Sequence, residues 1–243
     1  CIFVNADGIL WEMNYKTDEV PFILEKDISK VSGSMFVIRS DGSLWGKGPN
    51  KNGVIYVSAD EMVTEYVKLL DNVKSVYGTT EFVFALKENG ELYSWGLNPG
   101  ACLGTGDLES RYQPTLILDD VKEFEWNNFR VLALKNDGSV WRWGNTRYIV
   151  QAEQRTPPNY NLHQKKPEKM IGSIKKIIMQ ETYDMAIDNE NNLWAWGNNS
   201  WGQLGSAIAG SDKPTLIIGN VKEVYTSNTN STVVTNDGEL YIW

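Results

Sequence analysis

The 243-residue chain is acidic, with a formal net charge of -8 and a pI near 4.8, and its acidic residues are dispersed along the chain. A hydrophobic content of 42% and an aromatic content of 12% predict a sizeable core and exclude the disordered and collagen-like classes. The acidic balance argues against a nucleic-acid partner, which requires a basic surface. No apolar run reaches the roughly 20 residues of a membrane-spanning helix, so we expect no membrane insertion.

Six similar segments recur along the chain, each with two short runs of aromatic and branched residues around a tight turn. They are Phe3–Trp11, Phe36–Trp45, Phe84–Gly96, Leu132–Gly144, Met185–Gly197 and Val233–Trp243. All but the fifth place Asp-Gly or Asn-Gly at the turn, which is a strong hairpin signal. The fifth has Asn191 there, and asparagine tolerates the left-handed conformation well. The sequence therefore predicts six β-hairpins.

A further strand is expected before every hairpin except the first. These strands are expected at 28–31, 73–76, 121–124, 174–177 and 221–224. Pro-Thr-Leu-Ile segments that begin at Pro114 and Pro214 indicate additional strands, with proline as the first strand residue. Three to four strands per roughly 48 residues, without helical periodicity, predict an all-β fold of the β-propeller type.

We expect one propeller domain over residues 1–243, with repeats at approximately 1–27, 28–72, 73–120, 121–173, 174–220 and 221–243. The hairpin tryptophans are expected to fill the space between neighbouring sheets as scaffold. They are Trp45, Trp95, Trp141, Trp143, Trp194 and Trp196. The state of Cys1 and Cys102 stays open, since two cysteines indicate neither a disulfide framework nor a metal site.

Two stretches resemble the repeat of the regulator of chromosome condensation (RCC1-type) family. They are WGNNSWGQLG at Trp196–Gly205 and ALKENGELYSWGLNPGACLG at Ala85–Gly104. The resemblance implies a propeller of about six to seven blades. Because the first hairpin lacks a leading strand and the last one stops at Trp243, we expect an incomplete ring that belongs to a longer protein. The first two copies are expected to keep only the hairpin and to lose the extension after it.

The chain departs from some branches of the family it resembles. It has no basic tail of the kind that the resemblance implies for members acting as exchange factors for a small GTPase. An acidic chain without such tails is most similar to bacterial members, which include an inhibitor of β-lactamases. An extracellular or cell-surface location is therefore our expectation, with a cytoplasmic one left open.

Strand polarity predicts that the loops before each hairpin and the loops after it open on one face, with the Asp-Gly turns on the other. Loops on this face vary between repeats, as expected for binding loops on a constant scaffold. Side chains there that could contact a partner are Tyr77, Glu81, Trp126, Phe129, Arg130, Tyr183 and Trp201. The alternative for Trp126, Phe129 and Trp201 is packing over their own loops.

The sequence favours a non-catalytic module that binds a protein partner, as an enzyme inhibitor or a surface-protein module. A carbohydrate-binding propeller is the alternative, because Trp126 and Trp201 could stack on sugars. An enzyme is the third hypothesis, but the only histidine, His163, lies in a long expected loop at 154–167 without a catalytic motif around it. We expect no cofactor and no metal site.

Overall fold

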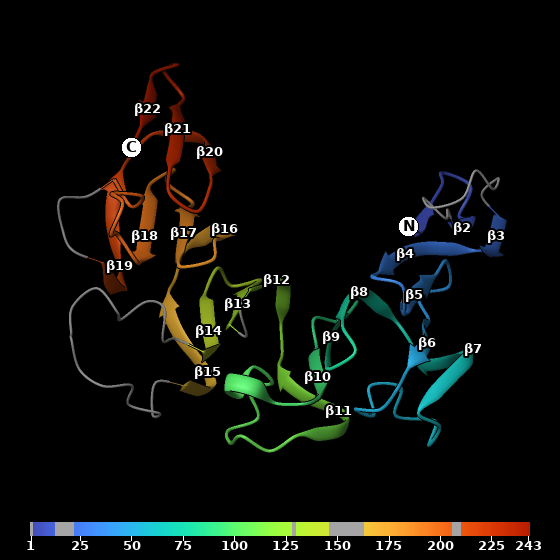
Figure 1. Ribbon diagram of the computed structural model, residues 1–243. Coiled ribbons are helices and arrows are strands. Elements are labelled where there is room, and N and C mark those ends of the chain that lie inside the picture. Colours follow the sequence, from blue (N-terminus) through green and yellow to red (C-terminus); the bar gives the residue numbers. More distant parts are fainter. Residues whose placement is uncertain (1, 13–21, 128–129, 146–162, 206–209) are drawn as a thin grey trace. The chain divides into compact units, whose positions relative to one another are not determined.

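The computed structural model describes residues 2–12, 22–127, 130–145, 163–205 and 210–243 (Figure 1). The first eleven strands are β1 (Ile2–Val4), β2 (Leu10–Glu12), β3 (Phe22–Glu25), β4 (Ile28–Ser32), β5 (Phe36–Arg39), β6 (Leu44–Pro49), β7 (Met62–Leu70), β8 (Val73–Gly78), β9 (Phe82–Lys87), β10 (Leu92–Gly96) and β11 (Arg111–Leu118). The others are β12 (Val121–Asn127), β13 (Arg130–Lys135), β14 (Val140–Asn145), β15 (His163–Ile171), β16 (Ile174–Met179), β17 (Tyr183–Asp188), β18 (Leu193–Gly197), β19 (Ser211–Ile218), β20 (Val221–Thr226), β21 (Ser231–Thr235) and β22 (Leu240–Ile242). A short 3-10 helix, η1 (Pro99–Ala101), follows β10.

Consecutive strands pair antiparallel into six sheets, which we number in chain order. The sheets are β1–β3, β4–β7, β8–β11, β12–β15, β16–β19 and β20–β22. Each contains one of the six expected hairpins, and the fold is of the all-β propeller class, as the sequence predicts. The first and last sheets have three strands, and the four sheets between them have four.

The residues group into two compact units, which we describe separately. The first unit comprises Cys1–Asn98 with Glu109–Asp119 and contains the first three sheets. The second comprises Pro99–Leu108 with Asp120–Trp243 and contains the last three. The division into one domain with the expected repeat boundaries stays a prediction.

Each hairpin turn is fixed by hydrogen bonds within its own few residues. In the fourth sheet the Asp137 carboxylate accepts bonds from the backbone N–H of Ser139 at 2.8 Å and from its hydroxyl at 2.5 Å. The Ser139 hydroxyl in turn accepts a bond from the Trp141 indole N–H at 2.9 Å. The second sheet repeats this chain of bonds with other residues at the same spacing, at Asp41, Ser43 and Trp45. The turn sequence thus positions both the hairpin and its first tryptophan.

The last tryptophan of a hairpin links neighbouring repeats. The indole N–H of Trp95 donates to the carbonyl of Val54 at 2.7 Å, and that of Trp143 donates to the carbonyl of Cys102 at 2.8 Å. Trp95, Trp143 and Trp196 are completely buried. These three side chains are scaffold, as expected from the repeat pattern.

Glycine is required where the third strand of a sheet ends. Gly197 has a φ of 114°, and a Cβ there would lie 2.5 Å from the Cα of Tyr183. Gly96 has a φ of 104°, and a Cβ there would lie 2.3 Å from the carbonyl oxygen of Glu81. Any other residue would clash with the neighbouring strand, so these glycines let the chain leave the sheet and begin its loop.

Two sequence expectations about strands are wrong in detail. Pro114 and Pro214 lie inside β11 and β19, three residues after each strand begins. Both strands form the edge of their sheets, and the pairing register shifts close to each proline. A proline lacks the N–H that a regular ladder needs, and an edge strand with a bulge does not require it.

Candidate functional site

The loop after β18 presents the most exposed tryptophan among the described residues. The Trp201 side chain is 75% exposed, whereas Gln203 and Leu204 beside it are buried. Large apolar side chains at the surface are common singly. With its ring largely in solvent, Trp201 adds little apolar burial to the fold.

Hydrogen bonds brace the first part of this loop, residues 198–205. The backbone N–H of Trp201 donates to the Gln203 side-chain oxygen at 2.9 Å, and that of Leu204 donates to the Asn199 side-chain oxygen at 2.8 Å. The carbonyl of Gln203 accepts from the Ser231 hydroxyl at 2.8 Å and from the Trp243 indole at 2.9 Å. The loop is therefore anchored to the sixth sheet by the buried Gln203, while Trp201 points outward.

The third repeat has no ring at the position of Trp201. When the Trp-Gly pairs that end β10 and β18 are aligned, Gly100 occupies the position of Trp201. In the second repeat the equivalent loop keeps its bracing residue, because the Asn50 side chain accepts from the Ile55 N–H at 2.7 Å, as Asn199 does from Leu204. The second copy lacks the rest of the motif, but the loop-bracing asparagine bond is present there as well.

Arg130 is a buried structural residue. Its guanidinium donates to the Asp184 carboxylate at 2.7 Å and to the carbonyl of Gln180 at 2.9 Å, which joins β13 to the fifth sheet. Both charged side chains are almost completely shielded from solvent, with 1% and 0% exposed. The expectation that Arg130 contacts a partner from an exposed position is therefore corrected, because the ion pair holds it inside the protein.

A second arginine lies in the same buried cluster. Arg142 is 5% exposed, and its Nε and Nη1 atoms have no hydrogen-bond partner among the described residues. Burial lowers the pKa of Arg142, whereas the negative charge of Asp184 opposes that change. Burial likewise raises the pKa of Asp184, opposed by Arg130, Arg142 and the Trp196 indole. Asp184 thus offsets part of the positive charge of the two arginines, which would be costly to bury without an opposite charge.

The three charged residues of this cluster replace uncharged residues of the third repeat. The register of the hairpins places Arg130 where the third repeat has Phe82, and Arg142 where it has Ser94. Asp184 stands at the position of Val83. Residues that are apolar or small in the third repeat are thus charged in the fourth and fifth. The clearest sequence signal of the cluster is Asp184, which stands where the third and fourth repeats have Val83 and Val131.

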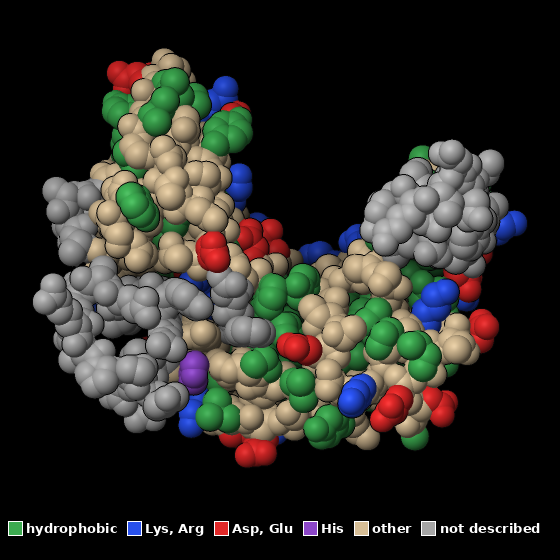
Figure 2. Space-filling model, viewed as in Figure 1, with side chains coloured by type: hydrophobic (Ala, Val, Ile, Leu, Met, Phe, Trp, Pro, Cys, Tyr) green, Lys and Arg blue, Asp and Glu red, His purple; other side chains and the backbone are tan. Residues whose placement is uncertain are grey.

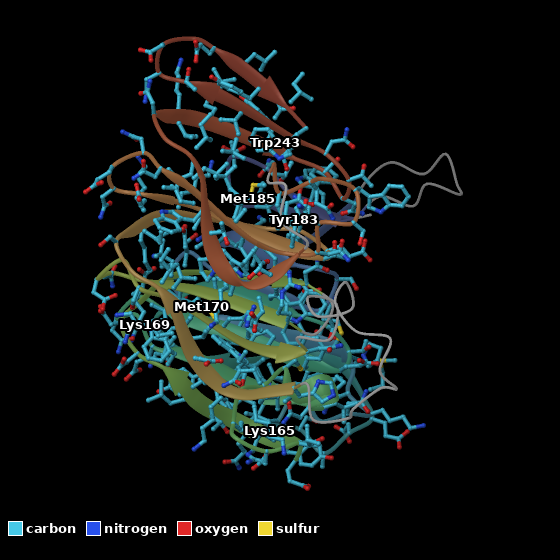
Figure 3. All side chains as sticks on the ribbon, turned by 90° about the vertical axis from the view of Figure 1, so that its left-hand side faces the viewer. Lys165, Lys169, Met170, Tyr183, Met185 and Trp243 are labelled. Carbon is cyan, nitrogen blue, oxygen red and sulfur yellow. The ribbon has the colours of Figure 1, made fainter. Side chains whose placement is uncertain are left out.

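Tyr183 is also buried, which corrects the expectation of an exposed contact. Its hydroxyl donates to the carbonyl of Ser227 at 2.6 Å, and its ring packs with Met185 in a core cluster that Trp243 covers (Figure 3). Burial raises the pKa of Tyr183, and hydrogen bonds with Ser231 and Thr226 oppose the change. The residue begins β17, where its side chain supports the loop of the sixth sheet.

The other candidate residues lie at separate places in the two units. In the first unit, Tyr77 is half-buried in β8 and Glu81 is exposed just before β9. In the second unit, Trp126 is half-buried in β12. Phe129 lies outside the described residues. Among the candidates that the structure describes, Trp201 therefore combines an aromatic ring with high exposure.

The structure also places the only histidine of the sequence and bears on a metal site. His163 does not lie in a loop as expected, because it begins β15 and pairs with Asn145. Its side chain, purple in Figure 2, is partly exposed at the surface. Residues 163–167 of the expected loop are thus strand, while 154–162 lie outside the described residues. Across the described ranges no group of three or more His, Cys, Asp or Glu could hold a metal ion, and no helix could span a membrane.

Comparison with known proteins agrees with this architecture. Residues 89–130 match the family model for the regulator of chromosome condensation (RCC1) repeat. No curated protein sequence matches the chain at a significant level. The fold and its repeated tryptophan links define a propeller-type repeat protein. Within it, the segment at residues 89–130 is similar to the RCC1 repeat.

Solved structures show the same fold at low sequence identity. Human WBSCR16 has a TM-score of 0.61 and 20% identity, with 86% of this chain and 58% of that chain covered. Prp20p from Saccharomyces cerevisiae has a TM-score of 0.62 and 17% identity, with 90% and 61% covered. A chain of the complex of Kap60 with yeast RCC1 (Prp20) has a TM-score of 0.59 and 21% identity, with 86% and 54% covered. This chain therefore spans somewhat more than half the length of these proteins.

Proposed function

We propose that this chain is a non-catalytic interaction module that binds a protein partner through the loop after β18, with Trp201 as the central contact. The observation that carries the proposal is the 75% exposure of Trp201 on a loop fixed by its own hydrogen bonds. Tryptophan is one of the residue types that dominate binding energy at interfaces. A fixed loop also loses little conformational entropy on binding.

Two similar structures support a protein as the partner class. The yeast protein Prp20p was characterised for binding to Gsp1p and histones, and yeast RCC1 (Prp20) was solved bound to Kap60. At the level of the repeat class, a propeller of this type serves protein interaction. Two more specific functions fit the same proposal. The module could inhibit an enzyme, or it could serve as a surface-protein module outside the cell.

The remaining candidates would extend the contact in different ways. In the second unit, the half-buried Trp126 could add apolar area near the loops that precede the hairpins. In the first unit, the exposed carboxylate of Glu81 and the half-buried ring of Tyr77 would form a separate contact. Arg130 and Tyr183 would act indirectly, by holding the sheets that carry these loops.

The proposal is tested by a photocrosslinking residue placed at position 201. A protein captured there is identified, purified and titrated against the unmodified chain, Trp201→Ala and Tyr112→Ala. Tyr112 is a matched control, since it is an aromatic residue with 60% exposure in the first unit. We expect Trp201→Ala to weaken binding by a factor of roughly 30, as for an interface residue worth about 2 kcal/mol. Equal affinities for the unmodified chain and Trp201→Ala would contradict the proposal.

The carbohydrate alternative uses the same side chain and needs its own measurement. An exposed tryptophan can stack on a sugar ring as well as on a protein. Binding of the chain to a glycan array, lost in Trp201→Ala and kept in Tyr112→Ala, would favour this alternative. Absence of glycan binding together with a saturable protein complex would favour the interaction module.

A further inference from the structure

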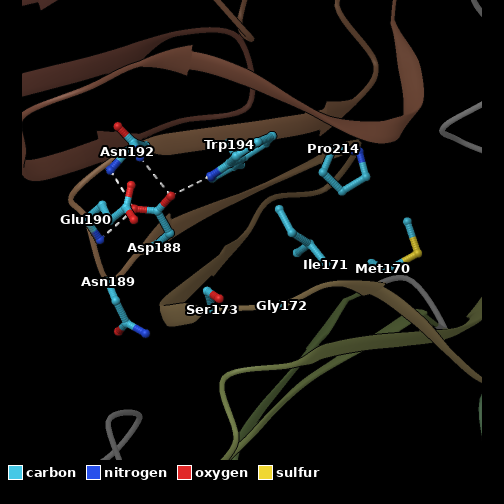
Figure 4. A pocket seen from close by; sticks show the side chains of 10 residues that line it. All are labelled: Met170, Ile171, Gly172, Ser173, Asp188, Asn189, Glu190, Asn192, Trp194 and Pro214. Atoms are coloured by element: carbon cyan, nitrogen blue, oxygen red, sulfur yellow. Dashed lines mark hydrogen bonds between the residues drawn. The ribbon is translucent and has the colours of Figure 1, made fainter.

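A cavity of about 550 Å³ opens at the turn end of the fifth sheet, at the opposite end of β18 from the Trp201 loop. It lies within the second unit, between the turn that joins β17 to β18 and the end of β15 (Figure 4). Among its lining residues are Ile171, Ser173, Asp188, Glu190, Trp194 and Pro214. The cavity thus combines an indole ring and apolar side chains with two carboxylates.

Other repeats show what normally occupies the space beside this ring. In three of them the last residue of the second strand is a cation that lies over the aromatic residue of the third strand. These pairs are Arg39 over Trp45 at 4.1 Å, Lys87 over Tyr93 at 5.8 Å and Lys135 over Trp141 at 5.7 Å from the ring centroid. Such contacts are cation–π interactions, which stabilise each hairpin from within.

The fifth repeat replaces that cation with an acid. The hairpin register places Asp188 at the position of Lys135, and Trp194 at the position of Trp141. None of the described side chains places a cation over the Trp194 ring. The repeat has therefore exchanged its internal cation for a carboxylate, and the cavity lies beside the ring that the cation would have covered.

The Asp188 carboxylate is held rigidly at the edge of the cavity. One oxygen accepts from the backbone N–H groups of Glu190 and Asn192 at 2.9 and 2.8 Å. The other accepts from the Asn192 side chain at 3.0 Å and from the Trp194 indole N–H at 2.9 Å (Figure 4). All four donors are neutral, so the group remains a fixed negative charge next to the ring.

We propose that this cavity binds the ammonium or guanidinium group of a lysine or arginine side chain from a protein partner. The partner's side chain would take the place that Arg39, Lys87 or Lys135 takes in its own repeat. Asp188 and Glu190 supply the opposite charge, and Ile171 and Pro214 supply apolar contact for the aliphatic part of the side chain. The chain's net charge of -8 also favours approach of a basic partner.

This site is independent of the interaction proposed for Trp201. The two lie at opposite ends of the fifth sheet and use different chemistry, a cation in one case and a protruding apolar ring in the other. A partner could contact either one alone. The experiment must therefore report on Trp194 itself.

The test follows the indole N–H resonance of Trp194 by NMR, assigned through its loss in Trp194→Tyr, a residue found at the same place in the third repeat. The probes are two capped tripeptides, Gly-Lys-Gly and Gly-norleucine-Gly, which differ only in the charged group. We expect the lysine peptide to shift this resonance in a saturable way that weakens with added salt, and the norleucine peptide to leave it in place.

A turn graft provides the decisive variant. Asp188→Lys, Glu190→Asp, Asn191→Gly and Asn192→Ser together give the fifth turn the sequence of Lys135–Ser139. The graft restores an internal cation in a turn that already folds in the neighbouring sheet, and Gly suits the φ of 67° at position 191. We expect lysine-peptide affinity to fall at least tenfold. Glu88→Gln, in the turn where Lys87 already covers Tyr93, should leave affinity unchanged.

Each outcome decides the proposal. An equal response to the norleucine peptide, no response to the lysine peptide, or undiminished lysine affinity in the folded graft variant would overturn it. Trp201→Ala should leave the lysine titration unchanged. Loss of partner binding at Trp201 and loss of cation binding at Trp194 are therefore separate results, and either proposal can fail without the other.

Discussion

The third and fifth repeats share one scaffold but differ at three positions that decide what their surfaces can bind. Both have the same four-stranded order, a buried tryptophan in the third strand and a positive-φ glycine after it. The differing pairs are Val83 and Asp184, Lys87 and Asp188, and Gly100 and Trp201. In the third repeat Val83 lies in an apolar core, Lys87 covers an aromatic ring and Gly100 lies in the short helix η1. In the fifth, the residues at these positions form a buried ion pair, a cavity and an exposed indole.

The comparison separates residues that hold the fold from residues that give it a site. Residues that recur in most repeats satisfy geometry common to every sheet, such as the tryptophan links and the glycine exits. Residues that depart from the repeat must be explained by something local. The fifth repeat concentrates such departures, so experiments there discriminate best between scaffold and function.

The largest effect is expected from breaking the ion pair that the third repeat lacks. Arg130→Ala leaves Asp184 buried without its partner, and removal of one member of a buried pair typically costs about 3–5 kcal/mol. Chemical denaturation at pH 7 measures the loss. A change below about 1 kcal/mol would show that water or neighbouring groups compensate the carboxylate.

The pH dependence of the same variant checks the cause. Burial raises the folded-state pKa of Asp184, so the folded protein binds a proton more readily than the unfolded chain there. The contribution of Asp184 to the free energy of unfolding is then greatest below its pKa in the unfolded chain. It is lost as the pH rises through its pKa in the folded protein. Without Arg130 that pKa should rise further. We therefore expect acidification below pH 7 to recover part of the lost stability.

Converting the whole cluster to the residues of the third repeat should have a smaller effect and the opposite sign. Arg130→Phe, Arg142→Ser and Asp184→Val together replace buried charges by the side chains that the third repeat uses. Replacement of buried ionic groups by apolar ones is often neutral or stabilising by about 1–4 kcal/mol. Thermal unfolding of the triple variant measures this. A loss as large as that of Arg130→Ala alone would show that the two repeats pack differently around these positions.

A pair of glycine substitutions tests the part of the scaffold that both repeats share. Gly197→Ala places a Cβ 2.5 Å from the Cα of Tyr183 at a φ of 114°, and we expect a loss of roughly 3 kcal/mol. Gly202→Ala meets no atom within 4 Å and has a φ of 78°, so only the backbone preference, about 1 kcal/mol, is lost. Equal losses measured by denaturation would mean that the close approach to Tyr183 relaxes without cost.

The shared features were predictable from the sequence, because they are local or repeated. Six hairpins follow from turn residues such as Gly138, whose signal needs no tertiary information. The scaffold role of Trp143 follows from its recurrence in other copies. The exposure of Trp201 was not predictable from its motif, although its variability between copies kept a binding role open.

The burial of Arg130 and Tyr183 could not be predicted, because it depends on contacts between repeats. Arg130 stands first in its strand beside a loop, where an exposed position is equally consistent with the sequence. The groups that compensate its burial, the Gln180 carbonyl and the Asp184 carboxylate, lie 50 and 54 residues further along the chain. The Trp194 cavity likewise depends on comparing Asp188 with its equivalents, which requires the register of every hairpin.

Acid sensitivity of the turns distinguishes the shared hairpin chemistry from the cluster. Hydrogen bonds from the Ser139 hydroxyl and backbone lower the pKa of Asp137. Asp137 therefore stabilises the folded protein above its pKa in the unfolded chain, near 3.9. This stabilisation is lost as the pH falls through its lower pKa in the folded protein. We expect Asp137→Asn to make the decline of stability below pH 4 shallower. If the free energy of unfolding declined equally steeply below pH 4 in the variant and the unmodified chain, protonation of Asp137 would not affect the stability of this turn.

The smallest effect on stability should come from the residue with the largest proposed role in binding. With 75% of its side chain exposed, Trp201 buries little area, so Trp201→Ala should change the free energy of unfolding by no more than about 0.5 kcal/mol. Trp196→Ala, five residues earlier and completely buried, should cost about 3–5 kcal/mol. Denaturation of the two variants compares them directly. If Trp201→Ala were as destabilising as Trp196→Ala, the indole would be bracing its loop, and the case for a preformed contact surface would be lost.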